Sequence, residues 1–345
     1  MLKRTITIQE PFEFEAGGVI SGLQVAFHTS PREYTPGEKV IWICHGLTAN
    51  SDAEEWWPQM VGPGLVFDTE KYFVVCTNML CSPYGSTCPI SENPATGRPY
   101  MLDFPKCTIR DLAKSALAVA DALGIKKIDL LIGASIGGFQ ALEMAMLRPD
   151  LVERAVFLAT AVRATPYLTA FNESQRMSIE ADPTFRAAES PEGGRAGLEA
   201  ARSIALISYR SSEGYNLTQA DADPDTLFAS RACSYQRYQG RKLSARFDAY
   251  CYWYLTYCLD SHNIGRGRGG VEAALAGLNL PATVIAIDSD CLFPPCDMKK
   301  IAAALPGSHY FEIKSSFGHD GFLLESAQLT EILMPLLPQG GQANC

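Results

Sequence analysis

Short apolar runs alternate with helical periodicity along the first half of the chain and again near its end. The apolar runs are typical of buried parallel strands, and they occur at residues 40–44, 72–76, 128–132, 155–159 and, after a long interruption, 282–287, with a last strand expected at 309–313. Apolar residues recurring three and four apart predict a helix from Thr108, which would cap it, to about Leu123, and a second helix from 137 to 148. Alternating segments at 5–9 and 22–28 predict a hairpin of edge strands. This order predicts an α/β fold with a mostly parallel, doubly wound sheet.

The alternation of strands and helices stops at about residue 165. From there to about 277 the sequence is almost entirely helical and has no strand of the buried type. A helical insertion of this length predicts a cap over the carboxyl ends of the strands, where ligands of parallel sheets bind. We therefore expect a core domain of residues 1–164 and 278–345 and a helical cap, or lid, domain of 165–277. Residues 93–99 are expected to form a loop, 326–334 a closing helix, and the Gly/Gln/Asn-rich tail to be disordered.

Composition narrows the class of protein further. The chain has 345 residues, 47% of them hydrophobic and 19% charged, and no apolar run approaches the roughly 18 residues that span a bilayer. The N-terminus has no signal-peptide core, and the 11 cysteines include no Cys-x-x-Cys pair, so we expect free thiols in a reducing cytoplasm. The net charge of −9 argues against nucleic acid and membrane surfaces as partners. A polyanionic ligand would need a local cluster of Arg or Lys.

The turn between the strand at 128–132 and the helix that follows carries a catalytic motif. Residues 133–137 read Gly-Ala-Ser-Ile-Gly, the G-x-S-x-G pattern of a nucleophile elbow. Glycines on either side of Ser135 keep β-carbons out of a crowded turn, so that its hydroxyl stands clear of the sheet. The Ile136 N–H, at the start of the helix, can then point at a developing oxyanion. The alternative is an ordinary Gly-rich turn, but the strand and helix around it favour the elbow.

A serine nucleophile needs a base to accept its proton and an acid to orient that base. Of the 5 histidines, His319 follows the last core strand, at the edge of the sheet where the serine is expected. Asp288 and Asp290 both follow the strand at 282–287, and either one can orient the base. A second oxyanion donor is expected from the turn after the strand at 40–44, and the Leu47 N–H is the candidate. The order serine, aspartate, histidine is that of the α/β-hydrolases.

The predicted cap contains a second group of candidate residues. Arg202 and Tyr209 are two helical turns apart and therefore share a face. An arginine on an otherwise apolar face is costly unless an anion meets it, which indicates either a ligand carboxylate or a structural one. We find neither a metal-ligand cluster nor a phosphate-cradling glycine loop.

Taken together, these residues resemble the homoserine O-acetyltransferase family, α/β-hydrolase-fold enzymes of methionine biosynthesis. The resemblance extends from about residue 29 to 333. Beyond the elbow, it rests on the blocks HGLT at 45–48, VGPG at 61–64, YFVVC at 72–76, YGST at 84–87, NPATG at 93–97, DFP at 103–105, FNESQR at 171–176, SYQRYQG at 234–240, SDCLFP at 289–294 and GHDGFLLE at 318–325.

The resemblance implies a function and a set of site residues. Its triad maps onto Ser135, Asp290 and His319, which favours Asp290 over Asp288, and its acceptor-binding residues look like Arg202, Tyr209 and Asp320. The implied reaction moves an acetyl group from acetyl-CoA to Ser135 and then to the hydroxyl of L-homoserine, with no metal and no permanently bound cofactor. It also implies a homodimer formed through the cap helices. The candidates for binding the phosphates of coenzyme A are Arg237, Lys242, Arg266 and Arg268. The alternative is that these four cations lie on the surface and bind nothing specific.

The chain departs from the family pattern near the expected oxyanion hole and acyl pocket. Ile136 stands where family members usually carry Met, Cys81-Ser82-Pro83 replaces a Gly-rich run, and Cys88 replaces Gly in Thr-Gly-Pro. These changes leave open a succinyl donor or another hydroxy-amino-acid acceptor such as serine. A serine esterase with water as acceptor is the third alternative. A transferase must exclude water from its acyl-enzyme, so a deep shaft roofed by the cap would favour transfer.

Overall fold

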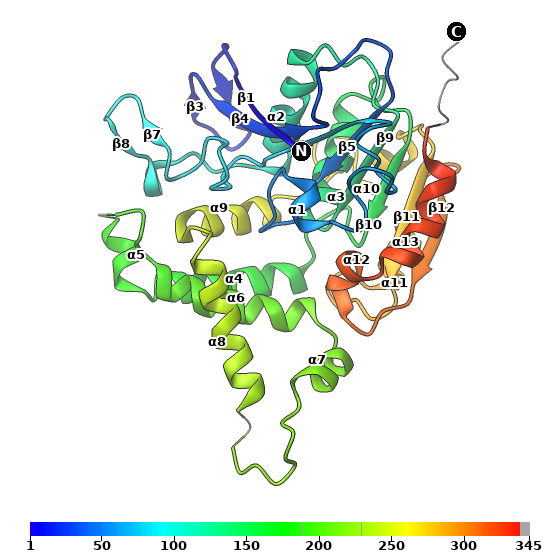
Figure 1. The fold of residues 1–345 in the computed structure, drawn as a ribbon. Helices are drawn as coiled ribbons and strands as arrows, with labels where there is room; N and C mark the ends of the chain where they lie inside the picture. Colours follow the sequence, from blue (N-terminus) through cyan, green and yellow to red (C-terminus); the bar gives the residue numbers. More distant parts are fainter. Residues whose placement is uncertain (189, 229, 339–345) are drawn as a thin grey trace.

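The computed structural model describes residues 1–188, 190–228 and 230–338, so the predicted disordered tail lies outside the described residues. Its centre is an eight-stranded sheet (Figure 1). The strands, in spatial order, are β1 (Leu2–Thr7), β4 (Gln24–Thr29), β6 (Phe73–Thr77), β5 (Val40–Cys44), β9 (Leu130–Ala134), β10 (Ala155–Leu158), β11 (Ala282–Ile287) and β12 (His309–Ile313). The six from β6 to β12 are parallel, whereas β1 and β4 pair antiparallel. The predicted fold class is confirmed, although β4 lies inside the sheet and not at its edge.

Alternate residues of each central strand pack on opposite faces of the sheet. In β5, Trp42 belongs to one buried cluster, whereas its neighbours Ile41 and Ile43 belong to the other. Both faces are therefore apolar, as a parallel sheet covered by helices on each side requires. The helices of the core are α1 (Ala53–Trp56), α2 (Ile109–Ala122), α3 (Ile136–Leu147), α11 (Pro295–Ala304), α12 (Gly321–Leu324) and α13 (Ser326–Leu333). Three short 3₁₀ turns accompany them, η1 (Met101–Asp103), η2 (Gly318–Asp320) and η3 (Met334–Leu336). As predicted, Thr108 caps α2, forming a capping box with Asp111.

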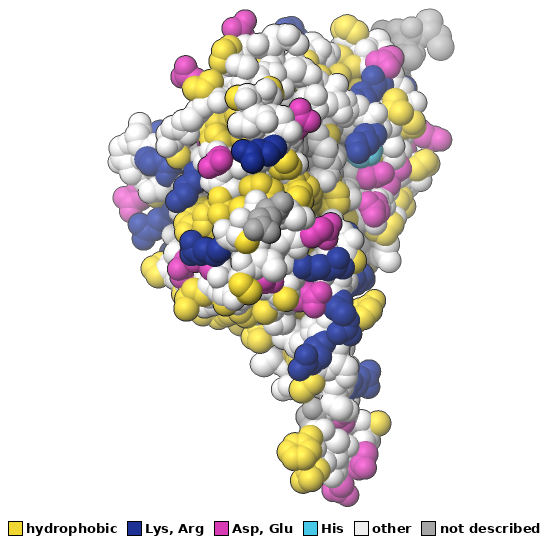
Figure 2. All heavy atoms as spheres, turned by 90° about the vertical axis from the view of Figure 1, so that its left-hand side faces the viewer, with side chains coloured by type: hydrophobic (Ala, Val, Ile, Leu, Met, Phe, Trp, Pro, Cys, Tyr) yellow, Lys and Arg dark blue, Asp and Glu magenta, His cyan; other side chains and the backbone are white. Residues whose placement is uncertain are grey.

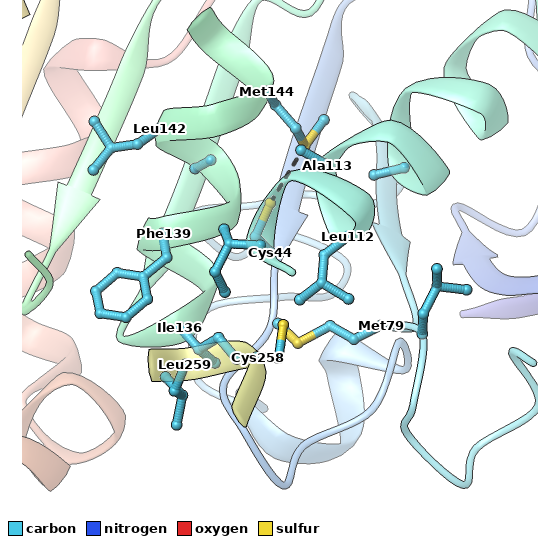
Figure 3. Close-up of a cluster of buried hydrophobic side chains, with 14 of the residues drawn as sticks. Cys44, Met79, Leu112, Ala113, Ile136, Phe139, Leu142, Met144, Cys258 and Leu259 are labelled. Carbon is cyan, nitrogen blue, oxygen red and sulfur yellow. Dashed lines mark hydrogen bonds between the residues drawn. The ribbon is translucent and has the colours of Figure 1, made fainter. Parts of the chain in front are cut away.

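Helix α3 is held between α2, the sheet and the cap. Figure 3 shows Ile136 and Phe139 of α3 among buried side chains that include Leu112 of α2 and Leu259 of the cap. On its sheet side, the Cys44 thiol of β5 lies 3.8 Å from the Met144 sulfur (Figure 3). The helix that follows Ser135 is therefore fixed on several sides.

Helices fill the chain between β10 and β11. They are α4 (Pro166–Glu180), α5 (Pro183–Ala187), α6 (Arg195–Tyr209), α7 (Ser212–Gln219), α8 (Arg231–Ser244), α9 (Ala249–Asp260) and α10 (Val271–Ala276). Helix α6 packs against both α4 and α8, and the chain around α7 and the start of α8 forms a protrusion away from the sheet (Figure 1). The helical insertion is thus present where it was predicted, while its independence as a domain stays a prediction.

Two local differences from the sequence-based expectations remain. The expected loop at 93–99 contains a small hairpin, β7 (Glu92–Asn93) with β8 (Arg98–Pro99), and a second pair, β2 (Phe12–Glu13) with β3 (Val19–Ile20), was not predicted. Two-residue strands carry too little periodicity to be recognised in a sequence.

Within the described residues, no helix is both long enough and apolar enough to cross a bilayer.

Candidate active site

Ser135 occupies a strained turn between β9 and α3. Its φ of 59° and ψ of −128° are unusual for a residue with a side chain, and such strain is typical of functional sites. The flanking glycines are required by close backbone contacts: a β-carbon on Gly133 would lie 2.1 Å from the Gly137 oxygen, and one on Gly137 would lie 2.1 Å from the Cys44 oxygen. The turn is held in place by the Ser135 N–H, which donates to Leu158 O at 3.1 Å. The G-x-S-x-G spacing therefore has a steric cause here.

His319 lies in η2, after β12, and is paired with Asp290. Its Nδ1 is 2.7 Å from Oδ2 of Asp290, and both side chains are buried. The other carboxylate oxygen of Asp290 accepts the N–H groups of Leu292 and Phe293 at 2.8 and 3.0 Å. A proton on Nδ1 thus donates to a fixed carboxylate and leaves Nε2 as the basic nitrogen.

Asp288, the alternative acid, is engaged elsewhere. Its Oδ1 accepts the Ser315 N–H at 2.9 Å, and its Oδ2 lies 3.4 Å from the Lys314 amine near the surface. Of the two aspartates after β11, Asp290 is therefore the one in contact with the histidine.

Leu47 follows β5 in a turn that a neutral histidine holds together. Buried His45 bonds through Nδ1 to the Gly46 oxygen at 2.8 Å, and its Nε2 accepts the Met79 N–H at 3.2 Å. Burial lowers the pKa of His45 to about 4, partly offset by the bond to Gly46, so the ring stays neutral at pH 7. Leu47 lines the same cavity as Ser135. The other predicted oxyanion donor, the Ile136 N–H, is at the first position of α3, where the helix offers it no backbone acceptor.

Ser135 and His319 open onto a cavity of about 730 Å³ between core loops and cap helices. The three residues predicted to bind an acceptor, Arg202, Tyr209 and Asp320, line this same cavity. The Tyr209 ring lies near both the acceptor arginine and the catalytic histidine. Its centroid is 5.6 Å from the Arg202 guanidinium carbon and 5.8 Å from the centroid of the His319 ring. Burial raises the pKa of the Tyr209 hydroxyl, with Arg202 opposing that shift and Asp320 adding to it. Six of the eight predicted site residues therefore line one cavity, while Asp290 and Ile136 are buried behind it.

Arg202 does not have the structural carboxylate that was its alternative explanation. Among the described residues no acidic side chain lies within 4.0 Å of it, and its buried Nε has no hydrogen-bond partner. Arg202 lines the serine's cavity, and a buried guanidinium nitrogen without a partner is costly unless an anionic ligand meets the group.

Arg210, which sequence analysis missed, contacts Asp320. It immediately follows Tyr209 at the end of α6, and its Nε donates to Oδ2 of Asp320 at 2.6 Å. The same segment packs closely on the histidine turn: the Ser211 hydroxyl donates to the Ser316 oxygen, and Gly318, with φ of 64°, has no room for a β-carbon. That atom would lie 2.6 Å from the Ser211 nitrogen. No spacing in the sequence indicates this contact, because it joins two segments far apart in the chain.

A second, much smaller hollow opens beside Ser135. Its volume is about 10 Å³, enough for roughly one water-sized group. Its walls are mostly apolar or neutral: Leu47, Leu168, Phe171, Asn172, Gln175, Ser208, Tyr209, Leu259, Leu292 and Phe293. Of the departures from the family pattern, Ile136 does not line this hollow and instead packs in the core (Figure 3).

The four cations predicted as candidates for phosphate binding have different surroundings in the structure. Arg266 and Arg268 are paired with Glu15 and Glu143, at 2.8 and 2.7 Å, which favours the alternative, in which they do not bind phosphate. Arg237 lines a separate surface hollow. Lys242 lines the catalytic cavity, together with a residue that was not predicted, Arg246. Within the part of the chain that the structure describes, no group of three or more His, Cys, Asp or Glu residues is arranged to hold a metal.

Comparison with known proteins agrees with this architecture. Residues 39–326 match the α/β hydrolase fold family, so the chain belongs to that class of proteins. A homoserine O-acetyltransferase from Cyclobacterium marinum is 40% identical over 333 residues, covering 96% of this chain and 94% of the relative. One from Trichormus variabilis is 39% identical, covering 94% and 90%. Within the α/β hydrolases, the chain is therefore a member of the homoserine O-acetyltransferase family.

Solved structures give the same fold. A homoserine O-acetyltransferase from Bacillus anthracis superposes with a TM-score of 0.90 over 99% of this chain and 98% of that one, at 24% identity. One from Staphylococcus aureus gives 0.80 at 29% identity, covering 99% and 98%. An esterase also superposes with a TM-score of 0.88 at 24% identity, covering 98% and 100%. Since transferases and an esterase share the architecture, the fold alone does not choose between acyl transfer and hydrolysis.

Proposed function

We propose that the protein transfers an acetyl group from acetyl-CoA to the hydroxyl of L-homoserine, a step of methionine biosynthesis. The observation that carries the proposal is Arg202, which lines the cavity of Ser135 together with Asp320 and whose buried Nε has no partner in the described residues. A cation and an anion beside one nucleophile suit an acceptor that brings both a carboxylate and an ammonium. A simple ester hydrolase has no use for that pair. The relatives that cover almost the whole chain are homoserine O-acetyltransferases, which supports the same acceptor.

In the first half-reaction, Ser135 Oγ attacks the thioester carbonyl as His319 Nε2 takes its proton. The negative oxygen of the tetrahedral intermediate is stabilised by the N–H groups of Leu47 and Ile136. When the C–S bond breaks, His319 returns the proton to the sulfur and coenzyme A leaves as the free thiol. Asp290 holds the imidazole in the required tautomer and stabilises the imidazolium that forms.

In the second half-reaction, homoserine places its carboxylate on Arg202 and Tyr209 and its ammonium near Asp320. His319 takes the proton of the homoserine hydroxyl, whose oxygen attacks the acetyl-serine carbonyl. The ester bond to Ser135 breaks, the serine oxygen regains a proton from His319, and O-acetyl-L-homoserine leaves. The chemistry is the reverse of the first step with oxygen in place of sulfur.

The small hollow beside Ser135 supports acetyl over succinyl as the acyl group. A volume of about 10 Å³ suits a methyl group better than a succinyl chain, which has two further carbons, the last of them a carboxylate. Its walls carry no cation to meet such a carboxylate.

The proposal extends to the assembly and the place of action. The cap, residues 165–277, is proposed to mediate a homodimer. Its protrusion exposes Leu217, Leu227 and Phe228 at 74, 86 and 81%, and Figure 2 shows hydrophobic side chains gathered at its tip. Large apolar side chains this exposed favour contact with a second protein surface. We further propose that the enzyme works in the cytoplasm, where its amino-acid and thioester substrates are found.

Trapping of the acyl-enzyme tests this function. Acetyl-CoA alone should add one acetyl group to the protein, which peptide mapping should locate on Ser135, and L-homoserine should discharge it as O-acetyl-L-homoserine. Ser135→Ala should take up no acetyl group and lose nearly all turnover. Discharge by water as fast as by homoserine would make the protein an esterase, and intersecting initial-rate lines without a labelled serine would rule out the two-step mechanism.

A further inference from the structure

Two cations at the end of α8 line the catalytic cavity in addition to those that the acceptor needs. Lys242 lies in the last turn of α8, and Arg246 follows one turn later. The acceptor brings one carboxylate, and Arg202 is already assigned to it. The extra positive charge therefore calls for another anion in the same cavity.

The surroundings of the two cations leave them available to a ligand. In residues 1–188, 190–228 and 230–338, neither has an acidic side chain within 4.0 Å. Arg246 donates only to neutral oxygens, those of Thr48 at 2.6 Å and the Tyr84 hydroxyl. Glu55 also lines the cavity, but it accepts a hydrogen bond from Asn50 at 2.7 Å.

Arg246 is oriented by the core and lies where two hollows meet. Its bond to Thr48 attaches it to the turn that carries Leu47, and Tyr84 is supported by an edge-on contact with Phe247 at 5.7 Å. It lines both the catalytic cavity and a second hollow of about 330 Å³ that Phe247 and Arg195 also line. A long ligand that reaches Ser135 with one end can therefore pass Arg246 on its way out.

We propose that Lys242 and Arg246 bind the phosphates of the acyl donor, and so select a phosphorylated thioester over a simple ester. This inference rests on the proposed function and deepens it. The chain carries a net charge of −9, which repels a polyanion at long range, so a donor with several phosphates needs local cations at the entrance. The guanidinium forms charge-assisted, bidentate bonds to phosphate, and the lysine adds a point charge.

Two donors with the same thioester separate phosphate binding from chemistry. Acetyl-CoA carries phosphates, whereas S-acetylpantetheine has none. In Lys242→Gln and Arg246→Gln, kcat/KM for acetylation of Ser135 by acetyl-CoA should fall about 10- to 100-fold each. With S-acetylpantetheine it should stay within about twofold of the wild type, and added KCl should slow the wild type with acetyl-CoA far more than the double variant.

Arg241→Gln is the matched control, because Arg241 precedes Lys242 in α8 yet lines a different hollow. It should leave acetylation by both donors unchanged. Equal losses with both donors in Lys242→Gln and Arg246→Gln, or an equal loss in the control, would overturn the inference. A wild-type protein that transfers no acetyl group from either donor to homoserine would instead contradict the proposed function.

Discussion

Arg210 and Asp320 form an ion pair at 2.6 Å that joins the end of α6 to the turn carrying His319. Each side chain is only 20% exposed. The pair occupies Oδ2 of Asp320, which leaves Oδ1 for a substrate ammonium. We therefore propose Arg210 as a positioning residue for the acceptor site, since it contacts Asp320 without lining the cavity itself.

Replacing Arg210 should weaken acceptor binding and leave acylation unaffected. Arg210→Ala should raise the KM for L-homoserine about tenfold, because a mobile Asp320 meets the ammonium less well. The rate at which acetyl-CoA labels Ser135 should not change. In an Asp320→Asn background the same replacement should have little further effect, and additive losses in that double-mutant cycle would show that Arg210 acts elsewhere.

The two aspartates after β11 should differ sharply in their effect on catalysis. Asp290→Asn should lower kcat by roughly four orders of magnitude, because the amide no longer holds the His319 tautomer. Asp288→Asn should do far less, since its carboxylate contacts Ser315 and Lys314. Steady-state rates of the two variants check the ranking, and the reverse order would transfer the role to Asp288.

Arg202 should matter to one half-reaction only. Removing one partner of a buried charge pair costs about 2–5 kcal/mol, so Arg202→Ala should cut kcat/KM for homoserine roughly 30- to several-thousand-fold. Acetylation of Ser135 should be little changed, and Arg202→Lys should restore only part of the loss, because it cannot make a bidentate contact. Rapid-quench measurement of each half-reaction provides the test, and equal slowing of both would remove Arg202 from the acceptor site.

Acid should destabilise the protein through His45. The pKa of this histidine falls from an ordinary 6.5 to about 4 on folding because the ring is buried. The unfolded chain therefore binds the proton more tightly, and stability present above pH 6.5 is lost as the pH falls towards 4, by at most about 3 kcal/mol. His45→Gln, which stays neutral, should reduce the slope of unfolding free energy against pH in this window. Urea denaturation at several pH values measures this slope. If the unfolding free energies of the wild type and of His45→Gln changed equally between pH 6.5 and 4, the assignment to His45 would be contradicted.

Local patterns explain which features could be predicted from the sequence. The central strands of the sheet are recognisable as apolar runs, and the elbow is a five-residue motif whose glycines are required by contacts within the turn and with β5. His319 was predictable because the ends of parallel strands meet at one edge of the sheet. Arg202 and Tyr209 were predictable as a pair since they share one helix face.

The features that escaped prediction depend on contacts between distant segments. Arg210 and Asp320 are 110 positions apart, and Arg246 and Thr48 are 198 apart. Neither arginine stands in a distinctive motif. Spacing likewise could not separate Asp288 from Asp290, and the difference arises because the Leu292 and Phe293 N–H groups hold Asp290 in place.

The close fit of Gly318 against Ser211 constrains how the enzyme can open. A cap that swung away on a hinge would drag the histidine turn with it, or would first have to break the Ser211–Ser316 and Arg210–Asp320 bonds. The end of α6 is therefore a fixed part of the site that holds His319, and not a movable lid. Opening of the cavity by a hinge at the end of α6 would therefore cost these contacts.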